Sequence, residues 1–331
     1  MYKPDSGITI ANQTLRLATD QKLKYEIGYS QYILSKANWA KANYRLSTQH
    51  GFEALKIFEN SIYIDEWVNC LLSLARTFID LRNTTVAREF LTKAISVAHK
   101  SSNTNTPADI YREFSLLLLN QHQYDSALLY CDKALVIYEK EKDTLTTSIV
   151  YGRKARIYYE LKDYTRSLYY NKKSLILDKL VNNRRALGVS YFIAAQIADK
   201  TNKQDSAIYF LTKSLKLNEA VGNIGTLIKS HELMADIYIQ KGKPDIATSE
   251  LKLVSQLKDT LYNLEKNGQI QEMQSIYELE TKDKTIKLLE QENVITNQRR
   301  ASDRLLLIYL LICIALLSAL ILVFWRIRII Q

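Results

Sequence analysis

The chain has 331 residues, 47% of them hydrophobic, and a formal net charge of +10 from 45 basic and 35 acidic residues. Nine Gly and three Pro supply few of the turns that a β-rich fold needs, so the composition favours an all-α fold. The basic residues are scattered along the chain, which argues against nucleic-acid binding. Cys70, Cys131 and Cys313 lack the paired spacing of a zinc site or a disulfide framework.

The first segment, residues 1–27, contains a short motif that recurs near residue 243. Residues 3–5 (Lys-Pro-Asp) match residues 243–245, and the separation is six times the forty-residue period described next. We therefore interpret residues 4–18 as the second helix of a hairpin whose first helix is missing, and 1–27 as a partial repeat with its connector. This interpretation predicts a chain truncated at its N-terminus.

Residues 28–267 repeat with a strict period of forty. Small residues occupy three positions of the unit, and aromatic residues recur at two others. The small positions are Ala87, Ala127, Ala207 and Ala247 with Ser47 and Ser167; Ala75, Ala155, Ala195 and Ala235 with Ser115; and Ala54, Ala94 and Ala134 with Ser174, Ser214 and Val254. Two helices cross closely only where side chains are small. The pattern predicts six helical hairpins, with tight turns marked by Asn83, Asp163 and Gly242.

The spacing of Ala75, Phe78, Ala87 and Ala94 resembles the tetratricopeptide repeat (TPR). The resemblance implies a superhelical solenoid of antiparallel helix hairpins that binds proteins or peptides. The family's usual period is about 34 residues, and we expect the additional residues of each unit in the longer loop and flanking turns. A HEAT-like solenoid of similar period is the alternative fold.

A charged helical stalk is predicted for residues 268–304. Its approximate heptad positions hold Ile270, Met273, Leu279, Ile286 and Leu289. Either a dimeric coiled coil or a single solvated helix fits so short a heptad pattern. The coiled coil would make the chain a homodimer.

Residues 305–325 are uncharged, and as a helix they extend about 30 Å, the thickness of a bilayer's hydrocarbon core. Arg304 and Arg326 bracket this segment, and Tyr309 and Trp325 lie near its ends, as interfacial aromatic residues do. We predict a transmembrane helix followed by a short basic tail, 326–331. The basic residues on its two sides do not decide its orientation.

The order of TPR array, charged helix and membrane span resembles bacterial membrane-bound histidine kinases and helix-turn-helix regulators. That resemblance implies a periplasmic sensory array in the inner membrane, with a cytoplasmic C-terminus and an output domain after residue 331. The alternative is a tail-anchored scaffold with cytoplasmic repeats, which assembles complexes and transmits no signal.

No catalytic motif stands out, and the chain as given is predicted not to be an enzyme and to hold no cofactor. Residues 230–233 (Ser-His-Glu-Leu) superficially resemble a kinase phospho-acceptor box, but His231 shares its repeat position with Tyr111, Tyr151 and Tyr191, so packing explains it. The other histidines have no partner at ligand spacing, so no metal site is predicted. Gly-rich phosphate loops and nucleophile elbows are absent from the sequence.

The resemblance to TPR arrays implies that the first helix of each hairpin lines a concave groove. The residues that would point into it are Arg76, Arg112, Arg156, Tyr159 and Phe192. Guanidinium groups beside aromatic rings grip acidic side chains or a C-terminal carboxylate by paired hydrogen bonds and stacking. We therefore predict a peptide-binding groove, the alternative being arginines that serve only solubility.

Overall fold

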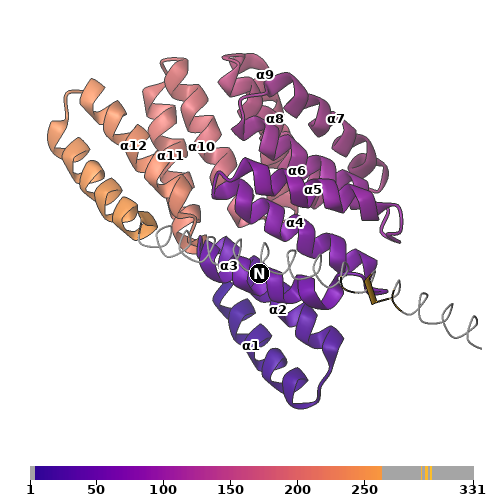
Figure 1. Cartoon of the computed structure of the whole chain (residues 1–331). Coiled ribbons are helices and arrows are strands. Elements are labelled where there is room, and N and C mark those ends of the chain that lie inside the picture. Colours follow the sequence, from indigo (N-terminus) through magenta and orange to yellow (C-terminus); the bar gives the residue numbers. More distant parts are fainter. Residues whose placement is uncertain (1–3, 263–291, 293–294, 297–298, 300–331) are drawn as a thin grey trace, which may run out of the picture. The chain divides into compact units, whose positions relative to one another are not determined.

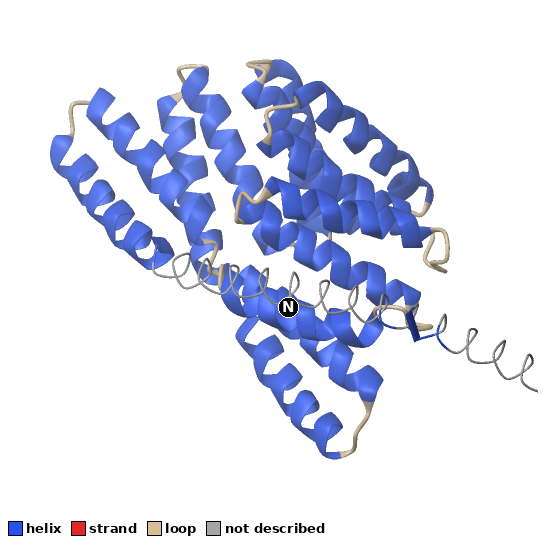
Figure 2. Cartoon of the chain, in the orientation of Figure 1, coloured by secondary structure: helices blue, strands red, loops and turns tan. Residues whose placement is uncertain are grey.

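The computed structural model describes residues 4–262, 292, 295–296 and 299, which form helices and short turns with no strand among them (Figures 1 and 2). The compact unit Met1–Glu272 contains every helix named here. The helices are α1 (Pro4–Asp20), α2 (Lys24–Ala40), α3 (Tyr44–Phe58), α4 (Ile64–Asp80), α5 (Thr84–Ala98), α6 (Thr106–Asn120), α7 (Tyr124–Lys140), α8 (Thr144–Glu160), α9 (Tyr164–Leu180), α10 (Arg184–Lys200), α11 (Gln204–Val221) and α12 (Ile224–Gln240), and residues 244–262 form a further helix. The predicted all-α fold is confirmed.

The even-numbered and odd-numbered helices occupy different positions in the stack. Each helix packs against the next one along the chain, and α2, α4, α6, α8, α10 and α12 also contact one another in that order. The odd-numbered helices α1 to α11 have no comparable contacts with one another. We call the even-numbered helices the inner helices and the others the outer helices, including the helix of residues 244–262.

The small residues of the forty-residue period lie where the helices cross. All members of one position have an exposed fraction of 0%: Ala75, Ser115, Ala155, Ala195 and Ala235. Ala87, Ala127, Ser167 and Ala207 are equally buried on the outer helices. The predicted helix crossings at these positions are confirmed.

The additional residues of each unit lie in the helices, and the prediction that they lie in the loops is wrong. α2, α4, α8 and α10 each span 17 residues, and most turns have three. The helices run long because few Gly or Pro interrupt them. Their ends are set by left-handed turn residues of many types, which recur at twenty-residue intervals except in the longer turns after α3 and α5: Lys22, Ala42, Arg82, His122, Lys142, Lys162, Asn182, Asn202, Gly222 and Gly242.

One residue often ends one helix and begins the next. The backbone N–H of Asp163 donates to the Tyr158 carbonyl at 2.9 Å, closing α8, and its carboxylate accepts the Arg166 N–H at 2.9 Å, capping α9. Asn83 does the same between α4 and α5. These bonds pair backbone groups that a helix end leaves without a partner. The turns predicted at Asn83 and Asp163 are confirmed.

Two predicted segments lie outside the described residues. The membrane helix, 305–325, is wholly outside them, and of the stalk, 268–304, the structure describes only Glu292, Ile295, Thr296 and Arg299. Among the described helices, none combines the length and the apolar content that crossing a membrane requires. The domain boundaries and the partial repeat at 1–27 stay predictions.

A buried carboxylate, that of Asp178 in α9, lies where α8, α9 and α10 pack together. Asp178 is fully buried, and its Oδ2 accepts the hydroxyls of Ser174 and Ser190 at 3.1 and 3.2 Å. Its Oδ1 has no hydrogen-bond partner among the described residues. Burial raises the pKa of Asp178, although the serine hydroxyls oppose the change. Forty residues later the same position holds a buried amide, Asn218.

We expect Asp178→Asn to stabilise the protein by about 1 kcal/mol or more at pH 7, because it removes an incompletely paired charge from the interior. A raised native pKa favours the protonated form, so the native state loses stability as the pH rises from 3.8, the ordinary value, through the raised one. The free energies of unfolding of the wild type and of Asp178→Asn, measured with denaturant, should therefore differ at pH 7 and agree near pH 3.5. Asp205→Asn, on an exposed carboxylate, is the control. A less stable Asp178→Asn at pH 7 would contradict this account.

Candidate binding surface of the inner helices

Glu113 of α6 joins two arginines from neighbouring inner helices. Arg76 of α4 donates to it through Nε at 2.6 Å and Nη2 at 2.7 Å, and Arg112 donates through Nε at 3.1 Å. Only 3% of the Glu113 side chain is exposed. Burial alone would raise the pKa of Glu113, but the two guanidinium groups outweigh it and lower the pKa to about 2. The carboxylate therefore stays ionised and ties α4 to α6.

A second cluster joins α6 to the outer helix α7. Nη1 of Arg112 lies 2.9 Å from the Asp109 carboxylate, and the hydroxyl of Tyr138 donates to the same carboxylate oxygen at 2.8 Å. Tyr138 is fully buried, so its hydroxyl requires this partner. Arg112 is thus paired with two carboxylates of its own helix, one of which also orients a core tyrosine.

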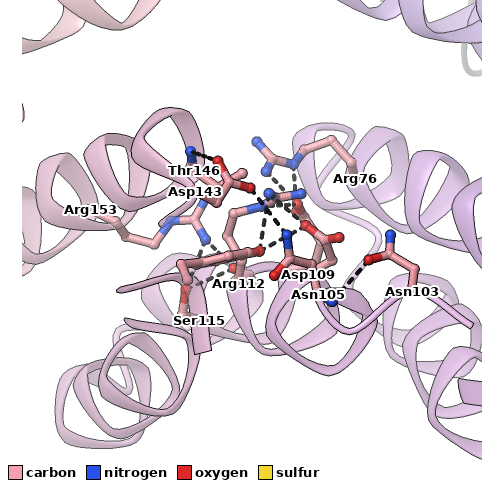
Figure 3. Close-up of polar contacts among 11 residues, drawn as sticks. Arg76, Asn103, Asn105, Asp109, Arg112, Ser115, Asp143, Thr146 and Arg153 are labelled. Carbon is pink, nitrogen blue, oxygen red and sulfur yellow. Dashed lines mark hydrogen bonds and ion pairs between the residues drawn. The ribbon is translucent and has the colours of Figure 1, made fainter. Parts of the chain in front are cut away.

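Arg153 of α8 extends the network without a carboxylate of its own. It is 7% exposed, and its Nη1 donates to Ser115 Oγ at 2.8 Å and to the Arg112 carbonyl. Figure 3 shows Arg76, Arg112 and Arg153 converging from three inner helices. Burial, followed by repulsion from Arg76, lowers the pKa of Arg153 to about 10. Arg153 therefore lies beside the Glu113 cluster with a hydroxyl and a carbonyl, not a carboxylate, as its hydrogen-bond partners.

A tryptophan connects inner helices that are far apart in the sequence. Trp39 of α2 donates its Nε1–H to Asp80 at 2.6 Å, while the guanidinium groups of Arg76 and Arg185 lie 5.5 and 4.9 Å from its ring centroid. Nη1 of Arg185, in α10, donates to the Ala40 carbonyl at the end of α2 at 2.8 Å, 145 residues away in the chain. A cation at a helix C-terminus is favourable. We call Trp39, Asp80, Arg76 and Arg185 the Trp39 clasp.

The five predicted groove residues have three different environments. Arg76 and Arg112 are engaged in the ionic network, and Phe192 is buried in a core cluster with Ala195 and Met234. Arg156 and Tyr159 are partly exposed on α8. Within the described part of the chain, no ion pair involves Arg156. Four of the five are therefore partly exposed, and Arg156 is the arginine among them that forms no ion pair within the described residues.

The sequence analysis missed Glu113, Arg153, Trp39 and Arg185. Glu113 and Arg153 occupy the same position of the forty-residue unit, where Ile193 follows in α10. Charged residues at a repeat position that holds Ile33, Ser73, Ile193 and Leu233 in other units were the available signal. The pairing of Arg185 with Trp39 has no such signal, because it depends on how the array curves.

The histidines and cysteines of the described part lie apart from one another. His50 contacts Gln31 at 2.6 Å, and His231 contacts Glu250 at 2.5 Å, each between an inner helix and the following outer helix. Cys70 and Cys131 are fully buried. No group of three metal-ligating side chains occurs in the part that the structure describes.

We expect Glu113→Gln to destabilise the protein by about 3 kcal/mol at pH 7, because it leaves two largely buried guanidinium groups without their shared counter-charge. The matched control is Glu59→Gln on the exposed pair with Lys93, which should cost under about 1 kcal/mol. The depressed pKa of Glu113 means that this stability is present above pH 4.5, the ordinary value, and is lost as the pH falls towards 2. Denaturant titrations of both variants measure the difference, and equal losses would refute the assigned role.

No family model and no curated protein sequence matches the chain. Solved structures do: a Rap protein complexed with competence and sporulation factor is 15% identical with a TM-score of 0.61, covering 79% of this chain and 72% of that one. The apo form of RapI is 15% identical with a TM-score of 0.58, covering 77% and 93%. A STAND protein with a tetratricopeptide-repeat sensor from Pyrococcus horikoshii is 18% identical with a TM-score of 0.54, covering 76% and 40%. The likeness is one of fold, and the fold is that of a tetratricopeptide-repeat protein.

Proposed function

We propose that the chain is a non-catalytic module that binds a protein or peptide partner on its inner helices through an acidic group. The observation that carries this proposal is Arg156, a partly exposed cation on α8 that forms no ion pair within the described residues, with Tyr159 one helical turn further along. A guanidinium group beside an aromatic ring suits a carboxylate on an extended peptide. The arginines Arg76 and Arg112 serve the fold and are not part of this site.

The charge of a second inner helix supports the acidic character of the partner. Lys229 of α12 has an exposed side chain. Desolvation by the surrounding protein and, after it, repulsion from Arg156 lower the pKa of Lys229. Glu160 and Glu232 offset this positive charge only in part, and a bound carboxylate would relieve the remaining repulsion.

We expect full-length protein to select carboxylate-bearing sequences from an array of random twelve-residue peptides. Arg156→Ala should then weaken binding of a selected peptide by about tenfold or more, the effect of losing a charge-assisted hydrogen bond. Arg166→Ala is the matched control, because Arg166 lies on the outer helix α9 paired with Asp163. Selection of uncharged peptides, or equal affinities of the two variants, would exclude this site.

The larger role follows from the predicted membrane segment. The array would be the sensory part of a membrane-anchored signalling protein, with residues 268–304 as stalk and 305–325 as span. The fold likeness to a protein that carries a tetratricopeptide-repeat sensor, and to a Rap protein complexed with a named factor, supports a sensor. A tail-anchored scaffold is the second candidate, and the side of the membrane on which the repeats lie distinguishes the two.

We expect a reporter cysteine, Thr104→Cys, to react in intact cells with a thiol reagent that cannot cross the inner membrane. Thr104 is exposed in the segment between α5 and α6. Cys70 and Cys131 are fully buried, and burial raises the pKa of both thiols, so they should stay silent in the unmutated control. Labelling only after the inner membrane is breached would place the repeats in the cytoplasm, and the scaffold would then be the supported function in place of the sensor.

A further inference from the structure

The outer helix α9, in the middle of the array, has a solvent-facing side rich in large apolar residues. Leu168 and Tyr169 are exposed near its start, and 66% of Ile176 and 75% of Leu180 are exposed further along. Residues 169, 176 and 180 follow one another at seven and four positions, so they lie on one side of the helix. Single exposed apolar residues are common, but such a row on one helix indicates a contact surface.

The charged residues on the same side of α9 are basic. Lys172 and Lys179 are exposed, and neither forms an ion pair within the described residues. α9 has one acidic residue, Asp178, which is fully buried. The side therefore presents positive charge and apolar surface together, without an exposed carboxylate of its own helix. We call it the α9 face, made up of Tyr169, Lys172, Ile176, Lys179 and Leu180.

The α9 face is a property of this unit and not of the repeat. Where α9 has Lys179, other units have an acidic residue: Glu59, Glu139, Glu219 and Asp259. Where it has Ile176, most other units have a polar residue: Arg16, Lys56, Ser96, Lys216 and Gln256. Packing within the array does not explain these replacements, because the residues are exposed, whereas contact with something outside the array does.

The neighbouring outer helices extend the apolar surface. Val136 and Leu129 of α7 occupy the repeat positions of Ile176 and Tyr169 and are exposed, as is Tyr209 of α11. Equivalent positions of successive outer helices face the same side of the stack, so these residues continue the α9 face. Two carboxylates of α7 already have partners within the array: Asp132 accepts Lys154 Nζ at 2.6 Å, and Glu139 accepts the Tyr151 hydroxyl at 2.5 Å.

We propose that the α9 face docks on the surface of a lipid bilayer that carries anionic headgroups. Lysines among Leu, Ile and Tyr side chains suit that surface, because the apolar groups enter the interface while the ammonium groups reach lipid phosphates. The residues project from the outside of a helix, and lipids can rearrange around each of them, whereas a protein partner would need a complementary groove. The predicted membrane segment 305–325 would keep the array close to a bilayer. This proposal concerns a different surface from Arg156 and does not depend on the acidic ligand.

The test places a fluorophore at Ile176→Cys and, as the matched control, at Ser96→Cys, the exposed residue at the same repeat position on α5. Cys70 and Cys131 are fully buried, and Cys313→Ser removes the remaining thiol, so each protein carries one label. The full chain is reconstituted with vesicles of phosphatidylglycerol and phosphatidylcholine in equal amounts, which contain a lipid that quenches at headgroup depth. We expect at least about three times as much quenching at Ile176→Cys as at Ser96→Cys, because the α9 face alone enters the interface. Any anchor at residues 305–325 is common to both labelled proteins.

A charge reversal checks the role of the lysines. Lys172→Glu with Lys179→Glu should reduce the quenching at position 176 to that of the control, because anionic headgroups then repel the face. α7 carries Asp132 and Glu139 at these two repeat positions, so the fold accepts carboxylates there and an unchanged circular dichroism spectrum is expected. Arg156→Ala should leave the quenching unchanged, which separates this test from that of the groove.

Three results would overturn the proposal. The first is equal quenching at the two labelled sites, and the second is quenching at position 176 that is as strong in vesicles of phosphatidylcholine alone. The third is a chain that sediments as a dimer with the label at position 176 already shielded in buffer, which would mean that a second copy covers the α9 face.

Discussion

The close crossing of successive helices is the constraint on which the rest of the structure depends. Ala75, Ala155 and Ala235 have no exposed surface, and at Gly188 even a methyl group would be too large, since a Cβ there would lie 2.7 Å from Nδ2 of Asn218. Dispersion contacts fall steeply with distance, so crossings of this kind keep their geometry only if each unit has the same length. A helix of 17 residues and a turn of three satisfy that condition, and around α3, α5 and α6, which have 15 residues each, longer turns make up most of the difference.

Charged residues are the second determinant of the structure, and those on the inner helices have two different roles. From α4 to α8, buried arginines and Glu113 connect neighbouring helices, and the Trp39 clasp joins α2 to α10. Desolvation offsets much of the attraction within a buried ion pair, but removing one partner is costly because it leaves the other charge buried and unpaired. Cations already committed in this way do not attract a ligand strongly. The site proposed at Arg156 rests on the opposite condition, a cation that forms no ion pair within the described part of the protein.

The fold was largely predictable from the sequence, whereas the internal pairing of the charged residues on the inner helices was not. Periodicity reports what all units share, so it located the crossings at Ala87 and Ala94 and the turns at Asn83 and Asp163. It cannot report what one unit does alone, such as placing Glu113 and Arg153 where α10 has Ile193. Family analogy assigned Arg76 and Arg112 to a groove because their positions face inward, but position does not reveal a competing internal carboxylate. The lengths of the loops were mispredicted because left-handed Lys, Arg and His residues end these helices in place of Gly or Pro.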